Sequence, residues 1–564
     1  MSNYSQFHIC NCLSGLAHRK RNSVVTVFGN RRRTGEQFVR GVLSLARGLL
    51  RLGLRSGDIV AVSAFNSDLY LEWLLAVAYI GCIAAPLNYR WSFKEARLAM
   101  ATIRPVMLVT DESCSHWYSE LQCNDLPSLQ WHGSLGSSCS DFMKTWSILT
   151  TDMIKEHCLT SPPLNYSWAP GGAVIICFTS GTTGRPKGVT ISHSSLVVQS
   201  LGKIAIIGYS EDDVYLHTAP LCHIGGLSSA MAMLMIGGCH VLLPKFEAKS
   251  ALEAIEQHLV TSLITVPTIM ADLITLIRKK EIWKGKDSVR KVLNGGGSLS
   301  VELIKDAIKY FPGAKLFSAY GMTETCSSLT FMTINDPALE TRGQLLETFG
   351  KTKRNSVHQP RGVCVGKPAP YVELNIRIEG SSDVGRILTR GPHVMLRYWD
   401  HVSAKPSKSD DEAWFDTGDI GHIDNCGNLW LLGQRGGRIK SGGENIYPEE
   451  VEMNLLQHEG VIAVVVVGIP DTRLMEMVVA CVKLRENWQW SDNDSGQTAE
   501  NKQLYLSSEV LKQHCRENNL TGFKIPKVFI QWRKPFPLTT AGKIRRNQVQ
   551  REVMSHFKSL PSNL

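Results

Sequence analysis

The chain has 564 residues, 43% of them hydrophobic and 20% charged, and its formal net charge is +10. This length exceeds what one hydrophobic core normally serves, so we expect two or more domains. No apolar run reaches the roughly 18 residues that a membrane-spanning helix needs. The nearest candidate, residues 69–86, contains Glu72 and is predicted to be a helix that runs into a strand. We therefore expect a soluble, multidomain protein.

The positive charge is concentrated at the two ends of the chain. Residues 1–35 contain six Lys or Arg and no acidic residue, and residues 516–564 contain ten Lys or Arg and two Glu. Nucleic-acid-binding proteins usually interleave aromatic side chains with basic ones on one face. The sequence shows no such array, so the basic C-terminal region favours phosphorylated small molecules as ligands.

The fifteen cysteines are scattered without paired spacing. This pattern, without a secretory signal, favours a reducing compartment and mostly buried thiols. His8, Cys10 and Cys12 form a cluster that resembles a metal site, but it lacks partners at zinc spacing. A packed helix over residues 9–17 is therefore the preferred interpretation of this segment.

Both ends of the chain carry possible targeting signals. The acid-free N-terminus has the composition of an organelle transit peptide. The last three residues, Ser562, Asn563 and Leu564, are close to the Ser-Lys-Leu peroxisomal signal, with Asn in the basic position. We expect a chloroplast location, a peroxisomal location, or both.

Residues 36–110 alternate helical stretches with short apolar strands, such as 59–62 and 106–109. This alternation is typical of a layered α/β fold. Residues from about 134 to 172 are polar and contain Pro and Ser, so they are predicted to form a connection.

The most informative stretch is Thr-Ser-Gly-Thr-Thr-Gly-Arg-Pro-Lys-Gly at residues 179–188. The apolar run at 173–178 predicts a buried strand before it, and α/β sheets place ligands at strand ends. Its glycines allow the backbone to approach an anion, while N–H groups, hydroxyls and Lys187 supply donors and charge. This pattern predicts a nucleoside triphosphate site, and a flexible surface loop is the alternative.

The spacing between Gly181 and Lys187 does not fit the Walker loop, and no hydroxyl follows the lysine. A simple P-loop NTPase is therefore disfavoured. Further motifs combine glycines with residues able to bind a nucleotide or a carboxylate. They are Pro220–Leu227, Asn294–Ser298, Tyr320–Glu324, Trp414–Asp419, the glycine-rich runs at 432–440 and 441–452, and Pro537–Arg546.

Four motifs, in this order along the chain, together resemble those of the adenylate-forming superfamily. They are the decapeptide, the Tyr-Gly-Met-Thr-Glu run at 320–324, the Thr-Gly-Asp run at 417–419 and the Thr-Ala-Gly-Lys run at 540–543. This superfamily includes acyl-CoA synthetases, luciferases and the adenylation domains of peptide synthetases. The resemblance covers essentially the whole chain and favours the acyl-CoA synthetase branch.

The resemblance implies an α/β fold with two domains. Residues 1–435 would form a large N-terminal ATP- and acyl-binding domain of layered α/β subdomains with a β-rich section. Residues 436–564 would form a small, mobile α+β lid domain that pivots at Gly436, where glycine can absorb a large change in backbone angles.

The resemblance also assigns nucleotide-binding roles. Tyr320 would stack on adenine, Asp419 would accept the ribose hydroxyls, Thr323 would bind the α-phosphate and Glu324 would hold Mg²⁺. Lys543 would bind the carboxylate and the α-phosphate during adenylation. The implied catalytic residues are Lys543, Lys187, Thr323 and Glu324, and the implied ATP-binding residues are Thr179, Ser180, Gly181, Thr182, Thr183, Gly184, Lys187, Gly295, Gly296, Tyr320, Thr323, Asp419 and Arg435.

Other residues are assigned to the acyl group and to coenzyme A. The implied acyl-binding residues are His223, Ser228, Gly296 and Gly297, and the implied CoA-binding residues are Gly442 and Gly443. The chain departs from the family pattern at Gln434, where the family usually has an arginine that contacts ribose. Arg435 follows one place later, and its contact with the nucleotide stays open.

The implied reaction has two steps. A carboxylate attacks the α-phosphorus of MgATP and releases pyrophosphate, and the thiol of CoA then displaces AMP to give a thioester. The expected ligands are therefore a small carboxylic acid, ATP, CoA and Mg²⁺. Chemistry of this kind depends on positioning and charge neutralisation rather than on a protein nucleophile.

Three further stretches, 175–178, 217–221 and 293–297, resemble a plant branch of these synthetases whose substrate is an aromatic acid with a second carboxylate and a keto group. Two alternatives remain open at this point. One is a synthetase for another acid, either medium-chain or aromatic such as 4-coumarate. The other is a nucleotide-binding homologue without turnover.

Overall fold

A computed structural model describes most of the chain. The segments that it does not describe are residues 1–6, 122–124, 137–147, 156–165, 180–185, 298, 300, 340–362, 379–382, 400–413, 435–438, 447, 492–503, 519, 521, 538–543 and 559–564.

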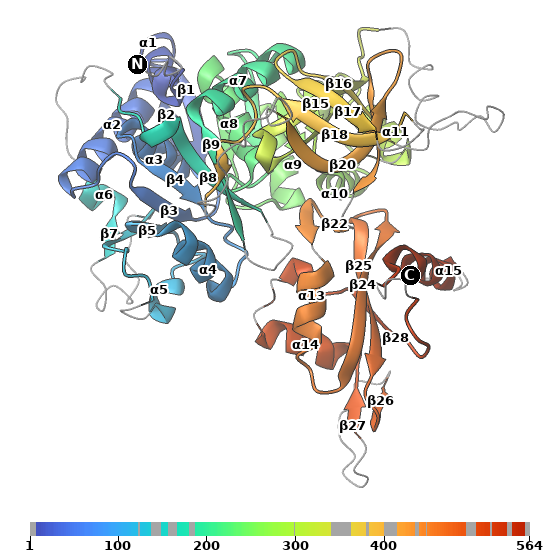
Figure 1. Ribbon diagram of the computed structural model, residues 1–564. Coiled ribbons are helices and arrows are strands. Elements are labelled where there is room, and N and C mark those ends of the chain that lie inside the picture. Colours follow the sequence, from blue (N-terminus) through green and yellow to red (C-terminus); the bar gives the residue numbers. More distant parts are fainter. Residues whose placement is uncertain are drawn as a thin grey trace. The chain divides into compact units, whose positions relative to one another are not determined.

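The chain forms two compact units. The larger consists of residues 1–89, 96–179 and 187–435, and the smaller consists of residues 436–564 with the short segments 90–95 and 180–186. Both units combine helices with sheets (Figure 1). The predicted α/β class, with a large N-terminal domain and a smaller C-terminal one, is confirmed.

The larger unit contains a 13-stranded sheet that is mainly parallel in one part and antiparallel in the other. Its strands from β1 to β14 run parallel apart from the edge strand β2, whereas those from β15 onward pair antiparallel. The order is β17 (Glu373–Ile378), β18 (Gly385–Arg390), β20 (Phe415–Ile423), β21 (Leu429–Gln434), β16 (Val363–Pro368), β15 (Ser327–Asn335), β14 (Lys315–Met322), β13 (Lys291–Asn294), β12 (Ser262–Thr265), β10 (Val214–His217), β11 (Cys239–Leu242), β1 (Val24–Phe28) and β2 (Arg31–Thr34).

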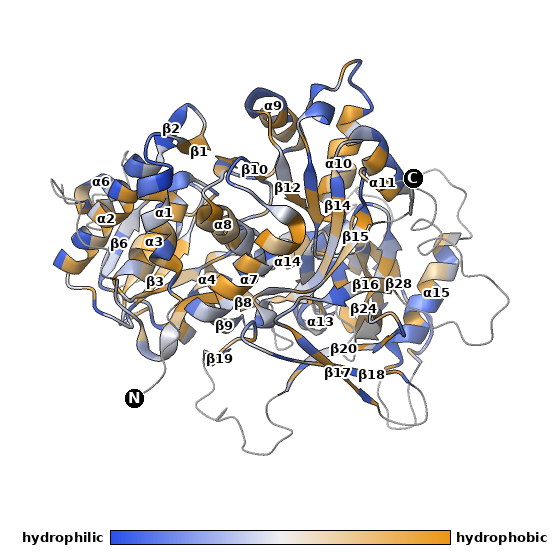
Figure 2. Ribbon diagram, turned by 90° about the horizontal axis from the view of Figure 1, so that it is seen from above, coloured by the Kyte–Doolittle hydropathy of each residue, from blue (hydrophilic) through white to orange (hydrophobic). Residues whose placement is uncertain are grey.

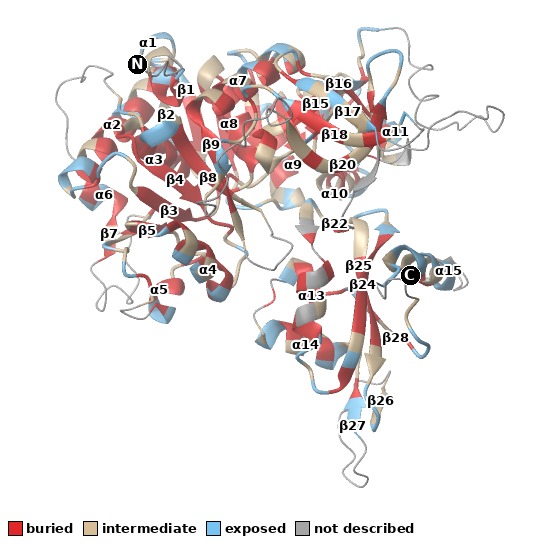
Figure 3. Cartoon of the chain, viewed as in Figure 1, coloured by how far each residue is buried: buried red, intermediate tan, exposed pale blue. Residues whose placement is uncertain are grey.

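A second sheet of the same unit carries the strands on either side of the decapeptide. Several of its strands are buried along their whole length, as Figure 3 shows for β3 and β4. Its order is β19 (Arg397–Tyr398), β9 (Lys187–Ser192), β8 (Ala173–Thr179), β4 (Ile83–Pro86), β3 (Ile59–Ser63), β5 (Met107–Thr110), β6 (Trp131–Ser134) and β7 (Ile148–Thr150).

Helices cover these sheets, and their sequences explain where they begin. Thr34 and Gln37 form a capping box before α2, and Ser67 caps α3. The helix α8 consists mainly of hydrophobic residues (Figure 2), and most of it is buried. The helices of the larger unit include α1 (Cys12–Arg19), α2 (Gly35–Arg51), α3 (Asp68–Tyr79), α4 (Phe93–Ile103), α5 (Trp117–Glu120), α6 (Thr151–Ile154), α7 (His193–Lys203), α8 (Ile224–Ile236), α9 (Ala248–His258), α10 (Pro267–Ile277) and α11 (Val301–Tyr310).

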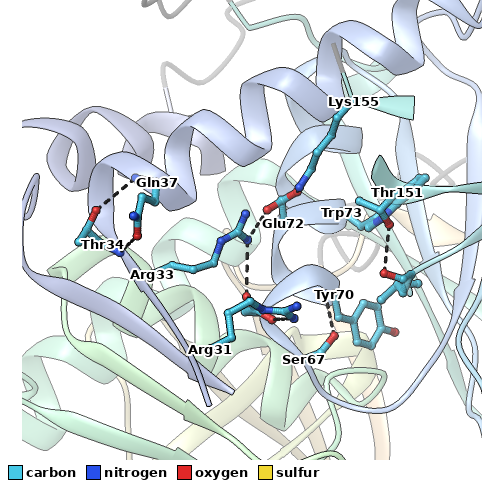
Figure 4. Close-up of polar contacts among 12 residues, drawn as sticks. Arg31, Arg33, Thr34, Gln37, Ser67, Tyr70, Glu72, Trp73, Thr151 and Lys155 are labelled. Atoms are coloured by element: carbon cyan, nitrogen blue, oxygen red, sulfur yellow. Dashed lines mark hydrogen bonds and ion pairs between the residues drawn. The ribbon is translucent and has the colours of Figure 1, made fainter. Parts of the chain in front are cut away.

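A buried ionic network holds the start of α3. Asp68 and Glu72 have side chains with almost no exposure, and Arg31 and Arg33 of the edge strand β2 pair with them. Lys155 Nζ lies 2.6 Å from Glu72 Oε1 and approaches from another side (Figure 4). Arg33 and Lys155 therefore compensate the negative charge of the buried Glu72 carboxylate.

The smaller unit is built on an antiparallel sheet of β23 (Glu444–Ile446), β22 (Ile439–Ser441), β25 (Met475–Leu484) and β24 (Val461–Asp471), with β28 (Val528–Gln531) parallel to β25. One face packs on α13 (Pro448–Leu455) and α14 (Ser508–Glu517), and the other packs on α15 (Arg546–Lys558). A short pair, β26 (Trp488–Trp490) and β27 (Leu504–Leu506), completes the described part.

The composition-based predictions can be compared with the described residues. Most of the described cysteines are buried and free, as predicted. His8 stacks on the rings of Tyr166 and His193, and no group of three metal-binding side chains was found in the described part of the chain. In the same part, no helix is both long enough and apolar enough to cross a membrane.

Candidate active site

A hydrogen bond joins two of the predicted nucleotide-binding residues. Tyr320 lies near the end of β14 and Asp419 lies in β20, and the phenolic hydroxyl donates to Asp419 Oδ2 at 2.6 Å. Asp419 is 3% exposed, and its backbone N–H donates to Thr417 Oγ1. The β-rich section and the parallel strands therefore place a carboxylate beside an aromatic ring.

Gly321 and Met322, the last two residues of β14, follow Tyr320. A Cβ atom on Gly321 would lie 1.6 Å from the carbonyl oxygen of Ser327, so only glycine allows β14 and β15 to approach this closely. A short 3-10 helix, Thr323–Thr325, follows at once, and Thr325 Oγ1 accepts a hydrogen bond from the N–H of Met322. This turn fixes the backbone of Thr323 and Glu324.

Tyr398 connects Glu324 to Lys187. Its hydroxyl donates to Glu324 Oε1 at 2.9 Å, and Lys187 Nζ lies 5.6 Å from the centre of its ring. Tyr398 comes from the two-residue strand β19, which pairs with β9. Tyr398 could not be predicted from the sequence, because a lone tyrosine gives no motif.

Glu324 has the chemistry that Mg²⁺ requires. Magnesium in nucleotide enzymes is usually held by one or two carboxylates together with the phosphates of the substrate. Glu324 offers a carboxylate that Tyr398 orients, and its backbone carbonyl accepts from the N–H of Met395 at 2.8 Å. This residue therefore fits a magnesium–ATP complex.

Only Thr179 and residues 186–188 of the decapeptide are described. Thr179 ends β8 and Lys187 begins β9, and the two residues pair across an antiparallel ladder. The predicted site residues Ser180, Gly181, Thr182, Thr183, Gly184, Arg435, Gly436 and Lys543 lie outside the described residues.

The glycine run follows the parallel strand β13. Asn294 donates from Nδ2 to the carbonyl of Gly297 at 2.6 Å, and the N–H of Gly295 donates to Thr265 at the end of β12. Nothing lies within 4 Å of the position that a Cβ on Gly295 would occupy. Beside Gly295 and the exposed Gly296, the backbone therefore leaves room for a flat group at the carboxyl end of the parallel strands.

The two predicted acyl-binding side chains lie in different surroundings. His223 immediately precedes α8 and is partly exposed. Ser228 is fully buried within α8, where its hydroxyl donates to the carbonyl of Ile224 at 2.6 Å and accepts from Lys203 Nζ at 2.7 Å. Lys203 was not predicted, because one lysine at the end of a helix normally lies in solvent.

In the smaller unit, Gly442 and Gly443 form the two-residue turn between β22 and β23. Their φ angles are 59° and 84°, and a turn with two positive φ angles matches the twist of a hairpin. The turn by itself therefore explains the two glycines, and their assignment to CoA stays a prediction.

Comparison with protein families supports the arrangement described above. The family model for the AMP-binding enzyme matches residues 15–399, and that for the AMP-binding enzyme C-terminal domain matches residues 450–543. The chain is 58% identical over 573 aligned residues to the chloroplastic/peroxisomal 2-succinylbenzoate–CoA ligase of Arabidopsis thaliana, and the alignment covers 100% of both chains. It is 30% identical over 528 residues to the indoleacetate–CoA ligase of Aromatoleum aromaticum, covering 90% of this chain and 91% of the relative.

Three solved structures are similar to this chain over nearly its whole length. An o-succinylbenzoate CoA synthetase (MenE) double mutant of Bacillus subtilis, bound with its product analogue OSB-NCoA, matches with a TM-score of 0.72 at 25% identity and covers 96% of this chain and 98% of its own. The MenE complex with the acyl-adenylate OSB-AMP matches at 26% identity with a TM-score of 0.61, covering 96% and 98%. The amide bond synthetase McbA of Marinactinospora thermotolerans matches at 25% identity with a TM-score of 0.77, covering 97% and 99%.

Proposed function

This chain belongs to the AMP-binding enzyme family, and from that membership we propose that it is an acid–thiol ligase for 2-succinylbenzoate. It would form 2-succinylbenzoyl-CoA from 2-succinylbenzoate, ATP and CoA through an acyl-adenylate. The observation that carries this proposal is the 58% identity, along the whole chain, to a plant ligase named for this substrate. The similarity to MenE structures that hold an OSB adenylate or an OSB-CoA analogue supports the same substrate class.

The geometry suits the first half-reaction. Tyr320 offers its ring to adenine, and its hydrogen bond orients Asp419 toward the ribose. Lys187 and Glu324 are close to the same tyrosine, Tyr398, so a cation and a metal-binding carboxylate lie together. Magnesium bound with ATP would neutralise the triphosphate, and Glu324 is the residue that we assign to hold it.

The remaining assigned residues complete the proposal. Thr323 would donate to the α-phosphate, and Lys543 would bind the attacking carboxylate and the α-phosphate. Thioester formation needs no protein nucleophile, because the mixed anhydride is already activated and the CoA thiol supplies the attacking group. Gly442 and Gly443 stay assigned to CoA.

We place the product in phylloquinone biosynthesis, the plant route that the resemblance to 2-succinylbenzoate–CoA ligases indicates. The relative in Arabidopsis is named chloroplastic/peroxisomal. Together with the acid-free N-terminus and the Ser-Asn-Leu ending, this name supports a location in chloroplasts, peroxisomes or both. Fluorescent fusions at one end and then at the other would reveal which signal acts, since each fusion masks one end.

A substrate panel tests the activity directly. Purified protein would be given ATP, Mg²⁺ and CoA with 2-succinylbenzoate, 4-coumarate, indoleacetate or a medium-chain fatty acid, and AMP release would be measured. We expect the highest kcat/KM with 2-succinylbenzoate and a thioester of the matching mass. A higher kcat/KM with another acid would support the alternative synthetase, and nucleotide binding without AMP release would support a non-catalytic homologue.

A further inference from the structure

Lys203 is a fully buried lysine at the end of α7. Its Nζ donates to Ser228 Oγ at 2.7 Å and to Ser229 Oγ at 3.0 Å, both on α8. These two hydroxyls donate in turn to the carbonyls of Ile224 and Gly225. Each serine is therefore oriented to accept from the ammonium group, which has three donors.

This charge has no carboxylate partner among the residues that the structure describes. Removing an ammonium from water is expensive unless an anion compensates for it. Burial lowers the pKa of Lys203 to about 7, and its electrostatic interaction with Cys326 opposes that shift. A side chain that served only as filler would be apolar here, so the buried ammonium indicates a ligand that brings a negative charge.

The backbone around Lys203 is irregular in two separate places. Directly after Lys203, α7 passes into a π-helical turn over Ile204–Gly208, a feature that is rare and frequent at functional sites. On another element, Cys326 and Ser327 have φ angles of 53° and 113°, which L-residues seldom adopt. Strain of this kind concentrates at binding sites.

The residues with which Lys203 interacts lie close in sequence to two predicted parts of the site, the acyl-binding segment and the Tyr320–Glu324 run. Ser228 and Ser229 lie in the first turns of α8, the helix that begins after His223. Cys326, with which Lys203 interacts electrostatically, follows Glu324 by two residues. The ammonium therefore contacts the helix that follows His223 and interacts with a residue that follows the Tyr320–Glu324 run.

We infer that Lys203, oriented by Ser228 and Ser229, binds the second carboxylate of the substrate, the one that is not activated. The inference rests on the proposed function, because it names the residue that selects a dicarboxylic acid. The third N–H donor of the ammonium would bond to that carboxylate. Since Nζ is enclosed in the absence of ligand, nearby side chains would change rotamer on binding, as is common at binding sites.

A charge-removing variant tests the inference. Methionine has a length similar to that of lysine and no charge, so Lys203→Met keeps most of the buried volume. Two keto acids with one carboxylate serve as probes: 4-oxo-4-phenylbutanoate lacks the ring carboxylate, and 2-butanoylbenzoate lacks the succinyl carboxylate. The probe that the wild-type protein turns over is compared with 2-succinylbenzoate.

We expect Lys203→Met to lower kcat/KM for 2-succinylbenzoate on the order of 100-fold, as for removal of one partner of a buried, hydrogen-bonded charge pair. The kcat/KM for the probe should change far less, so the preference for the dicarboxylate collapses. An equal loss with both acids would overturn the inference and indicate a structural role. Lys280→Met, which removes a lysine paired with Glu256 on the surface, should leave the ratio unchanged.

The wild-type protein provides a second test that needs no variant. Above its pKa of about 7 the Lys203 side chain becomes neutral and loses its attraction for a carboxylate. The ratio of kcat/KM for 2-succinylbenzoate to that for the probe should therefore fall from pH 7 to pH 9, by up to about tenfold per unit. A ratio that stays constant over this range would overturn the inference.

Three titratable groups around Lys203 do not change charge in this range. Burial raises the pKa of Cys326 to about 12. It also raises the pKa of Tyr215, which interacts with Ser229, and that of Tyr371, which packs on Gly202 beside Lys203. Failure of the proposed function is distinguishable, because a wild-type protein without activity toward 2-succinylbenzoate would show it before any variant or pH series is made.

Discussion

The hydroxyl of Tyr320 donates to Asp419 Oδ2 at 2.6 Å, although the two residues are 99 positions apart in the sequence. Each comes from a different region of the same large sheet, Tyr320 from β14 and Asp419 from β20. Both residues are buried, so little water competes for this hydrogen bond. The surfaces proposed for adenine and for ribose are therefore fixed as one unit.

Replacing Tyr320 with Phe should weaken ATP binding while keeping the ring. The substitution removes the donor that orients Asp419, and hydrogen bonds to charged groups contribute about 1.5–3 kcal/mol. We expect the KM for ATP to rise by roughly tenfold or more, with a smaller effect on the KM for the acid. Tyr310→Phe, on α11 outside the site, is the control, and an unchanged KM for ATP in Tyr320→Phe would contradict the role of this bond.

Glu324→Gln should change the dependence of the first half-reaction on magnesium. An amide has no negative charge, so the metal–ATP complex loses its carboxylate ligand. We expect adenylation to slow on the order of 100-fold, by analogy with losing one electrostatic contact to the transition state. Pyrophosphate release measured against Mg²⁺ concentration should show a raised half-saturation point, and an unchanged curve would exclude Glu324 as the ligand.

Tyr398→Phe separates orientation of the carboxylate from its charge. The variant keeps Glu324 and removes only the 2.9 Å hydrogen bond to it. Hydrogen bonds to charged groups contribute about 1.5–3 kcal/mol, so the same magnesium titration should shift by roughly tenfold, less than the loss expected for Glu324→Gln. A loss as large as that of Glu324→Gln would mean that Tyr398 has a further role.

The parts of the fold that local sequence determines were predictable. The strand at 59–62 is seen as β3, and the apolar run before the decapeptide is seen as β8. These segments are strongly β-branched and buried, so their pattern is unambiguous. The region from 134 to 172 was predicted to be only a connection, but it contains the strand β7 and the short helix α6, which are too brief to give a periodic signal.

The predicted site residues were identified from sequence motifs. The residues that contact them could not be identified in this way. Tyr398 reaches Glu324 because a two-residue strand pairs with β9, a pairing that no local pattern specifies. Lys203 gave no signal for a similar reason. Its burial results from the packing of α7 on α8, and a sequence does not show which end of a helix meets a neighbour.

Glu72→Gln should destabilise the larger unit. Its carboxylate is buried and pairs with Arg33 and Lys155 (Figure 4), so the amide removes the charge that Lys155 pairs with and one of the two carboxylates that Arg33 pairs with. Breaking a buried pair of this type typically costs about 3–5 kcal/mol. We expect a clearly lower midpoint of thermal or urea unfolding, whereas Glu36→Gln, which removes exposed pairings with Arg21 and Arg40, should leave the midpoint nearly unchanged. Equal midpoints for the two variants would show that the network contributes little.

Lys543→Ala should separate the two half-reactions. Lys543 lies outside the described residues, and its assignment to the carboxylate and α-phosphate is tested best by kinetics. Removing one cation from the adenylation transition state should slow acid-dependent pyrophosphate exchange on the order of 10²–10³-fold. Thioester formation from added acyl-adenylate and CoA should be nearly unaffected, because the α-phosphorus is no longer attacked in that step. Lys534→Ala, which removes a largely exposed lysine paired with Glu552 in the same unit, is the matched control and should leave both rates unchanged. If Lys543→Ala slowed both half-reactions equally, the lysine would act in a step common to both, and its assignment to adenylation would be wrong.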